Sequence, residues 1–297
     1  MMVFRGVKVK AMVYRGTMRY RILVLSTALL LAVTGCAKDL VTGKKTLNYY
    51  SLKSEPALGQ RVLVQQAKAA KKKGKKMDSA ADAKEYERIQ GIVERIRPHT
   101  HYPKFPYEVH LVDSKVVNAW CAPGGKMMVY TGLWDPKKGL VEKGNEDQLA
   151  AVLAHEMAHA NARHVTESIS RNMTIMMAGA AVQTAIAAGG SNTGANLFGE
   201  VFSDGMNIYV PSYSRKNEYE ADRLGLMYMA KAGYDPREAV KLWKEAAKRK
   251  KDRTSIFASH PSSGARARQL EKLLPEAMAL YEKSLAVKDG KKDVDGR

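Results

Sequence analysis

The sequence predicts an α+β fold with more helix than sheet, and three features support this. Apolar residues recur at helical spacing, most clearly at Ile89, Ile92, Val93 and Ile96. Between residues 107 and 132 the pattern changes to three short β-rich runs divided by turn residues. The rest of the chain is mostly helical in pattern. We therefore expect a predominantly helical domain with a small antiparallel sheet of about three strands.

The composition indicates a globular chain and argues against a nucleic-acid partner. The 297 residues are 45% hydrophobic, which suffices for one large domain or two small ones. Two regions contribute much of the net charge of +19: positions 1–35, with six basic residues and no acids, and the run KAAKKKGKK at 68–76. No recognisable nucleic-acid module accompanies them. The lysine run is interpreted as a solvated face or loop, or alternatively as a contact with anionic lipid headgroups.

The N-terminal segment predicts a lipoprotein signal peptide. A basic start at Met18–Arg21 precedes an apolar core at 22–33, which is too short for a stable membrane span but fits a secretory signal. The segment ends in Val-Thr-Gly-Cys36, which resembles the lipobox of bacterial lipoproteins. Cys36 would be acylated and anchor the chain, and the following Ala37 favours the outer membrane. The alternatives are a general signal peptide with an incidental cysteine, and a true start at Met18.

The stretch NEDQLAAVLAHEMAHANARHV predicts a helix that carries metal ligands. Asn145 is a suitable N-cap for it. His155 and His159 are four residues apart, so they lie on one face, one turn above the other, and both can reach one zinc ion. Glu156 lies beside them, where it can accept a proton from a zinc-bound water. This is the HExxH signature of zinc peptidases.

A catalytic zinc needs a third protein ligand, and two candidates compete. Metzincins place a third histidine six residues after the second, with a glycine at the bend. Val165 and Ala162 occupy the corresponding positions here, so that pattern fails. His164 falls one residue short and is interpreted as a helix-terminal or packing histidine.

The second candidate is Glu218, in the segment SRKNEYEADRLGL. Glu218 and Asp222 are four residues apart and share a helix face. In gluzincins a glutamate from a second helix completes the zinc site, and an aspartate one turn later hydrogen-bonds a zinc histidine from behind. The alternative is a charged surface helix, since basic residues lie nearby. The intact HExxH upstream favours the metal site.

Four stretches together resemble the gluzincin family of HtpX, the CAAX prenyl proteases and the lipid-anchored bacterial relatives BepA and LoiP. They are Asn118-Ala119 with Pro123-Gly124-Gly125, LAAVLAHEMAHANARH, SRKNEYEAD, and His260-Pro261 with Arg266. The resemblance covers about residues 55–275. Because no convincing set of transmembrane helices is present, it is closest to the peripheral lipoprotein members.

The resemblance implies a mechanism with one zinc ion per chain, held by His155, His159 and Glu218. The ion would lower the pKa of its bound water towards about 7. Glu156 would take the proton as that water attacks a peptide carbonyl, and would deliver it to the leaving amine.

The family also implies that His260 and Arg266 lie near the site. Either would stabilise the developing oxyanion. A sharper hypothesis is that His260 occupies the open zinc position until substrate displaces it. The alternative is that His260 caps a helix and Arg266 pairs with a surface acid.

The strand near Asn118 and Ala119 is predicted to pair with an extended substrate by β-augmentation, which suits unfolded or misassembled proteins. Cys121 in the same strand is interpreted as a small buried or edge residue and not as a nucleophile. The glycine-rich stretch 189–205 is expected to be a mobile flap or an ordinary loop. The nearly uncharged stretch 173–190 is expected to be a buried or groove-lining helix and not a membrane span.

The sequence thus predicts a zinc metalloendopeptidase that hydrolyses unfolded or misassembled envelope proteins. It would be tethered by its lipidated cysteine at the periplasmic face of the outer membrane. The alternatives are a self-inhibited or weakly active chaperone or assembly factor on the same fold, and a lipid-anchored binding module. The expected divisions are a signal peptide at 1–35, a tether at 36–54, the peptidase domain at 55–285 and a polar tail at 286–297.

Overall fold

The computed structural model describes residues 36–38, 41, 43, 45–187, 213–248, 256–260 and 264–295. The chain divides into two compact units, one of residues 1–49 with 167–209 and one of residues 50–166 with 210–297. Each unit is described by itself. The expected signal peptide and the expected flap at 189–205 lie outside the described residues.

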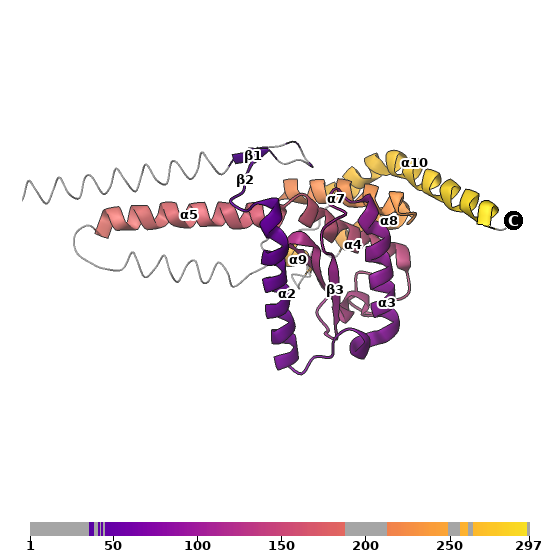
Figure 1. Ribbon diagram of the computed structural model, residues 1–297, viewed down its shortest axis with the longest axis horizontal. Coiled ribbons are helices and arrows are strands. Elements are labelled where there is room, and N and C mark those ends of the chain that lie inside the picture. The colour runs from indigo at the N-terminus through magenta and orange to yellow at the C-terminus, as the bar shows by residue number, and fades with distance from the viewer. Residues whose placement is uncertain are drawn as a thin grey trace, which may run out of the picture. The chain divides into compact units, whose positions relative to one another are not determined.

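The larger unit contains most of the helices and one sheet (Figure 1). Its helices are α2 (Glu55–Lys72), α3 (Ser79–Ile96), α4 (Glu146–Asn161), α7 (Arg215–Lys231), α8 (Pro236–Lys248), α9 (Ile256–Ser259) and α10 (Gly264–Asp295). Short 3-10 turns are η1 (Leu52–Ser54), η2 (Arg97–His99), η3 (Pro123–Gly125) and η4 (Thr131–Trp134). The strands are β3 (Glu108–Val112), β4 (Ala119–Ala122) and β5 (Lys126–Tyr130). The predominantly helical α+β class is confirmed.

The sheet is mixed, and the expectation of an antiparallel sheet is wrong for one of its two pairings. The strand order is β3-β5-β4. β4 and β5 form an antiparallel hairpin closed by η3, with Cys121 opposite Met127. β3 pairs with β5 in parallel, with Val109 opposite Met127. Neighbouring strands in the sequence suggested neighbours in space, but the chain between β3 and β4 carries β4 to the far side of β5. β4 therefore lies at the sheet edge.

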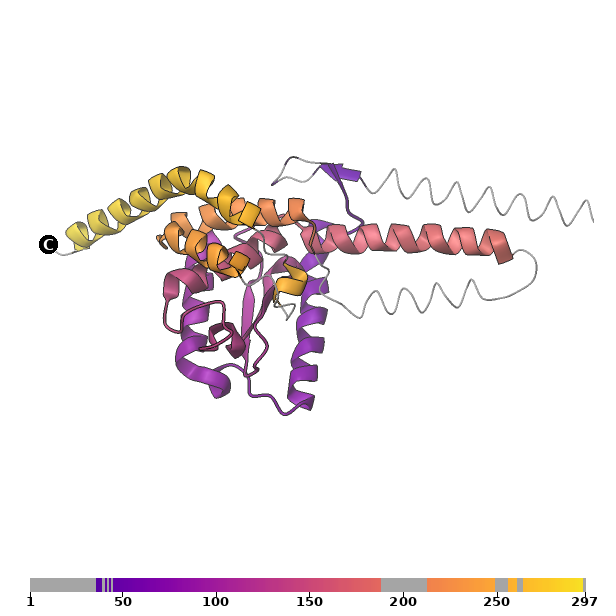
Figure 2. The same ribbon diagram turned by 180° about the vertical axis from the view of Figure 1, so that it is seen from behind.

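Helices α2 and α3 stand on either side of the sheet (Figures 1 and 2). α3 packs against β3 and α4. Its predicted apolar face is confirmed: Ile89, Ile92, Val93 and Ile96 are all buried. α2 packs on β5 and on the η3 turn. The approach is close, because a Cβ at Gly59 would lie 1.9 Å from the carbonyl oxygen of Pro123.

Helix α4 is the centre of the larger unit. Every residue from Gln148 to Asn161 is buried, with α7, α8, α3 and β4 packed around the helix. Its start agrees with the prediction, since the side-chain oxygen of Asn145 accepts a hydrogen bond from the Gln148 amide at 3.0 Å. A helix surrounded on all sides holds its side chains in fixed directions.

Of the last helices, α8 packs directly on α4. α8 begins at Pro236, and proline suits the first position of a helix. α10 packs on both α7 and α8. It continues as a helix to Asp295, through most of the segment expected to be a polar tail.

The smaller unit contains the strand pair β1 (Cys36–Lys38) and β2 (Lys45–Leu47) and most of helix α5 (His164–Ala187). The expected tether therefore includes regular structure; the side chain of Cys36 lies outside the described residues. In α5, residues 173–177 are exposed or half-buried, so of the two expectations, a buried or a groove-lining helix, the buried one is wrong for them. Among the described residues, no helix combines the length and hydropathy that a bilayer span requires.

Candidate metal centre

Two helices, α4 and α7, bring the predicted ligands together because their backbones almost touch. A Cβ at Gly225 of α7 would lie 2.9 Å from the backbone nitrogen of His155. Glu218 lies seven residues, or two turns, before Gly225 and so projects from the same face of α7. Ser214 caps α7 by accepting a hydrogen bond from the Asn217 amide at 3.2 Å, which fixes the turn that carries Glu218.

The predicted ligands form one buried cluster, which also contains His260. Ligand atoms of His155, His159, Glu218 and His260 all lie within 4.8 Å of one another. Nε2 of His155 is 3.1 Å from Nε2 of His159. The Glu218 carboxylate lies 3.5 Å from the first imidazole and 3.4 Å from the second. Two imidazoles from α4 thus meet a carboxylate contributed by α7.

This donor set fits a zinc ion. Zinc in proteins is bound by imidazole nitrogen and carboxylate oxygen, and three such groups face one another here. The electrostatics agree. Burial alone would lower the pKa of His155, but the carboxylates of Asp222 and Glu218 outweigh it and raise the pKa to about 9. The surroundings of the His155 ring therefore favour a positive charge there, whereas burial holds the pKa of the neighbouring His159 well below its ordinary value.

Asp222 and Arg266 lie behind the ligands. Oδ1 of Asp222 is 3.1 Å from Nδ1 of His155. Arg266 donates two hydrogen bonds to Asp222, at 2.8 and 2.6 Å, and also contacts Glu218. Its guanidinium lies 4.0 Å from the ring centre of Trp243. Arg266 is buried, and so are both acids, so its partners are not surface acids. Burial alone would raise the pKa of Asp222, but Arg266 outweighs it and lowers the pKa.

His260 joins the cluster from the segment that follows α9. Its Nδ1 is 3.0 Å from Oε1 of Glu218 and 3.3 Å from Nε2 of His155. Its Nε2 is 3.4 Å from the Glu156 carboxylate. His260 follows α9, and its amide donates to the Ile256 carbonyl at 2.7 Å. The structure therefore places His260 among the ligands and not at a distant helix cap.

Glu156 lies beside the cluster, where its carboxylate contacts Nε2 of His260 at 3.4 Å. The side chain is buried, and neither carboxylate oxygen makes a hydrogen bond within the described part of the chain. Burial raises its pKa above the ordinary value for glutamate. The thiol of Cys121 is buried in β4. Burial, together with the charge of Glu156, raises the pKa of this thiol well above its usual range. Cys121 is thus a poor nucleophile.

The predicted substrate strand lies at the sheet edge beside α9. Ala119 begins β4, and the carbonyl of Asn118 accepts a hydrogen bond from the Tyr130 amide at 3.1 Å, which extends the pairing with β5. Immediately before it, the Val117 carbonyl accepts from the Ile256 amide at 3.1 Å. A backbone hydrogen bond therefore joins the segment that carries His260 to the residues just before the edge strand β4.

Two further residues lie against His159: His164, interpreted from its sequence position as a helix-terminal or packing histidine, and Tyr213, which no sequence pattern indicated. Nδ1 of His164 lies 2.9 Å from Nδ1 of His159, and its Nε2 lies 3.2 Å from the Glu220 carboxylate. The ring of Tyr213 stacks on His159, with 3.9 Å between ring centres. His164 does begin a helix, as expected, but it also supports a ligand. Arg163, with φ of 57°, breaks the helix and turns His164 back towards α4. In the sequence, the only indication of this contact was a histidine placed directly after the HExxH helix.

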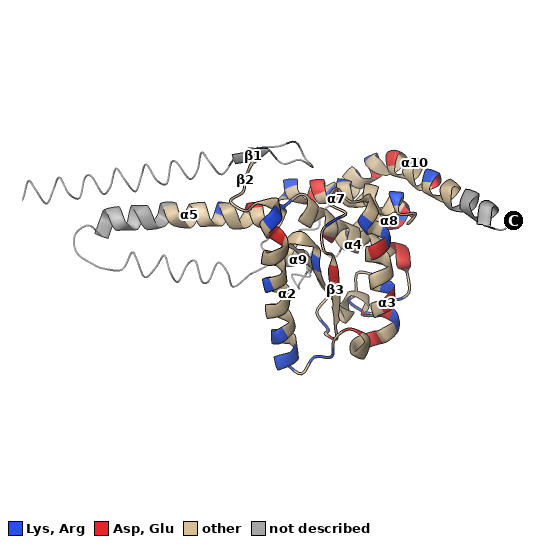
Figure 3. Ribbon diagram, in the orientation of Figure 1, with Lys and Arg blue, Asp and Glu red and all other residues tan. Residues whose placement is uncertain are grey.

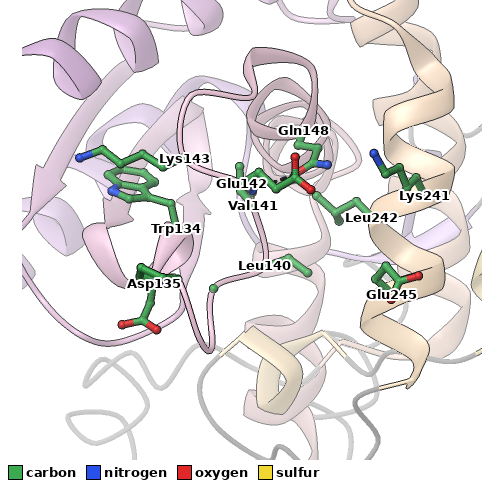
Figure 4. Close-up of a pocket in the computed structure, with 12 residues that line it drawn as sticks. Trp134, Asp135, Leu140, Val141, Glu142, Lys143, Gln148, Lys241, Leu242 and Glu245 are labelled. Atoms are coloured by element: carbon green, nitrogen blue, oxygen red, sulfur yellow. Dashed lines mark hydrogen bonds between the residues drawn. The ribbon is translucent and has the colours of Figure 1, made fainter.

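The larger of two cavities in this unit lies apart from the cluster. It has a volume of about 360 Å³ and lies between the loop after η4 and helix α8 (Figure 4). Trp134, Leu140 and Leu242 line it, and Gln148 forms part of its wall. None of the cluster residues does. The space behind His155 is only about 10 Å³, too small for more than one water molecule.

Comparison with known proteins gives consistent matches. Residues 83–274 match the family described as Peptidase family M48. The chain is 35% identical over 199 residues to mitochondrial metalloendopeptidase OMA1 of Schizosaccharomyces pombe, covering 66% of this chain and 55% of the relative. It is 30% identical over 181 residues to the human mitochondrial metalloendopeptidase OMA1, covering 59% and 33%. The Beta-barrel assembly-enhancing protease of Escherichia coli K12 is 28% identical over 152 residues, covering 50% and 30%. The chain spans about half or less of these relatives.

Proposed function

Because the chain belongs to peptidase family M48, we propose that it is a zinc-dependent metalloendopeptidase. His155, His159 and Glu218 would hold one ion per chain. The observation that carries the proposal is the meeting of the α4 imidazoles with the α7 carboxylate in a buried cluster. The names of the relatives, which are metalloendopeptidases, support it.

The chain's own residues suit peptide hydrolysis at such a site. When bound, zinc supplies Lewis acidity, which polarises a peptide carbonyl and acidifies water. Glu156 accepts the proton of the attacking water and passes it to the departing amine nitrogen. Its position directly after His155, buried beside the clustered ligands, places its carboxylate where both transfers would occur. Asp222 holds the His155 ring in one orientation from behind.

His260 has two proposed roles at the open side of the site. In the first it donates a hydrogen bond to the developing oxyanion. In the second it is a further ligand that closes the site until substrate arrives. Its position among the ligand atoms, and the attachment of its segment beside β4, favour the second role. The same observation favours the alternative function, a self-inhibited or weakly active assembly factor on this fold.

The substrates we propose are unfolded or misassembled proteins of the cell envelope. β4 is an edge strand, and an edge strand binds extended backbone with little regard to side chains. We further propose that Cys36 is lipidated and holds the protein at the periplasmic face of the outer membrane. The motif Val-Thr-Gly-Cys36 and the similarity to an Escherichia coli protease named for β-barrel assembly support these proposals.

Metal analysis and proteolysis test the enzymatic proposal. The purified protein should contain one zinc per chain and cleave casein or itself, and a chelator should stop the cleavage. Glu156→Gln should keep the zinc and lose at least about a hundredfold in rate. Glu238→Gln, which removes a carboxylate that hydrogen-bonds the start of α4 far from the cluster, is the control and should keep both properties.

The possible outcomes separate the candidate functions. A protein without bound zinc, or cleavage that Glu156→Gln leaves intact, contradicts the peptidase. A zinc-bound wild type that cleaves nothing, with cleavage appearing in His260→Ala, identifies the self-inhibited form. Unchanged activity in His260→Ala removes both proposed roles of His260.

A further inference from the structure

The lysine run forms a projection from the body of the larger unit. We call Lys68–Lys76 the lysine projection. Buried residues of α2 end at Leu63, and the helix continues to Lys72 without another. At 1.5 Å per residue, the nine helical residues from Val64 to Lys72 extend about 13 Å beyond the last buried residue of α2. The chain rejoins the body at Met77, which bridges to Val112 beside the sheet.

The projection is an ordered helix end. Gly74 adopts a left-handed conformation with φ of 67°. The Lys75 amide donates to the Ala70 carbonyl at 3.1 Å, and the Gly74 amide donates to the Lys71 carbonyl at 2.9 Å. These two bonds form a Schellman C-cap, which stops the helix and turns the chain back. The lysines are therefore displayed on a defined structure.

The charge of this projection is uncompensated. All six of its lysines are exposed: Lys68, Lys71, Lys72, Lys73, Lys75 and Lys76. Between Glu55 and Asp78 the sequence contains seven basic residues and no acidic one. Within the described part of the chain, none of the six forms an ion pair. Figure 3 shows basic residues gathered at this end of α2.

Helix energetics explain only part of this arrangement. Lysines in the last turn interact favourably with the helix dipole, which accounts for Lys71 and Lys72. It does not account for the lysines beyond the cap. Like charges three and four residues apart, such as Lys68 with Lys72, repel and weaken the helix. An anionic partner would offset that repulsion.

From this geometry we infer that the lysine projection binds the anionic headgroups of a lipid bilayer. The run contains only lysine, alanine and glycine. It has no aromatic side chain on which a nucleic-acid base could stack and no arginine for bidentate phosphate binding. Clusters of four to eight basic residues on a helix suit diffuse attraction to a negatively charged surface.

The sequence also places the projection within reach of a membrane. Cys36, the proposed site of lipidation, lies 19 positions before Glu55, where α2 begins, so this step rests on the proposed anchor. A stretch of that length spans at most about 68 Å when extended. A bilayer that holds the N-terminal region would therefore be at high effective concentration around the larger unit, a condition that no free anionic polymer shares.

Lysine footprinting with vesicles tests this inference on the full chain. Acetylation of each lysine is measured by mass spectrometry with phosphatidylcholine vesicles, with and without phosphatidylglycerol. The six lysines should be protected only by the anionic vesicles, and added salt should remove the protection. Equal protection by neutral vesicles, or none by anionic ones, overturns the inference. Stronger protection by a single-stranded DNA oligonucleotide than by anionic vesicles overturns it in favour of a nucleic acid.

Paired charge variants give an independent measurement. The first replaces the six lysines of the projection with glutamine. The matched control replaces six exposed lysines on other surfaces: Lys104, Lys115, Lys137, Lys231, Lys272 and Lys283. Both variants lose the same net charge. Affinity for anionic vesicles should fall at least about tenfold in the first and little in the control. Equal losses would show a general charge effect and overturn the inference. Thermal unfolding checks that both variants fold.

Discussion

Nδ1 of His155 lies 3.1 Å from Oδ1 of Asp222, and Nε2 of the same ring faces the other ligands. A buried acid thus lies against one nitrogen of a ring whose other nitrogen is presented to the metal centre. Arg266 in turn holds the acid with two hydrogen bonds. The expected effects of five substitutions follow from contacts described above.

Asp222→Asn should weaken zinc binding. The amide keeps the size of the side chain but removes the charge that orients His155, and loss of such a partner costs about 10–100-fold in metal affinity. Competition with a chromophoric chelator measures this. The control is Asp113→Asn, which changes an exposed carboxylate that accepts a hydrogen bond from the Thr131 hydroxyl. This variant should bind zinc as the wild type does. Equal zinc affinity in all three proteins would exclude the orienting role of Asp222.

His164→Ala should also weaken zinc binding, although His164 is not one of the clustered ligands. It removes the contact at 2.9 Å that supports His159 from behind. We expect about a tenfold loss in zinc affinity, at the lower end for such supporting residues. Zinc titration of His164→Ala beside His99→Ala, a half-buried histidine away from the cluster, provides the comparison. If the two variants bind zinc equally well, His164 has only a packing role.

Arg266→Met should destabilise the folded protein strongly. Methionine fills similar space, but it leaves Asp222 and Glu218 as buried carboxylates without their cation. Breaking a buried pair in this way costs about 3–5 kcal/mol. Chemical denaturation of zinc-free protein measures the free energy of unfolding. Lys248→Met, which breaks an exposed pair with Glu245, should change it by less than about 1 kcal/mol. Equal free energies for the two variants would contradict this account.

Gly59→Ala and Gly91→Ala should have opposite effects, although both replace a helical glycine. A Cβ at Gly59 would meet the Pro123 carbonyl at 1.9 Å, so α2 must move away from η3, at a cost of about 1–3 kcal/mol. A Cβ at Gly91 meets nothing within 4 Å, so alanine should stabilise α3 by about 0.5–1 kcal/mol. Thermal melts of both variants measure these changes. Similar shifts in both would show that the contact of α2 with η3 is not tight.

The sequence predicted local structure better than pairing between distant segments. The spacing of Ile89 to Ile96 and the capping residue Asn145 depend on neighbours in the chain, and both predictions are confirmed. The parallel pairing of β3 with β5 depends on the route of a six-residue connection, which no periodicity encodes. The mixed sheet was missed for that reason.

The same distinction applies to the candidate site. The HExxH spacing fixes His155 and His159 within one helix, and the resemblance led to Glu218, which belongs to another. The metallopeptidase family is confirmed over residues 83–274. Tyr213 and Trp243 could not be foreseen, because their places beside His159 and His155 arise only from packing between helices. The lipid anchor and the outer-membrane location stay predictions.

The glycine at position 225 has a consequence for how the protein would fail when heated. α7 packs directly on the backbone of α4. The spacing of Glu218 from His155 and His159 is therefore set by the interface between these two core helices. Separation of α7 from α4 would release a bound ion, and a bound ion would oppose that separation. Heat inactivation and metal loss should then be one cooperative event, with a melting temperature that rises with free zinc concentration.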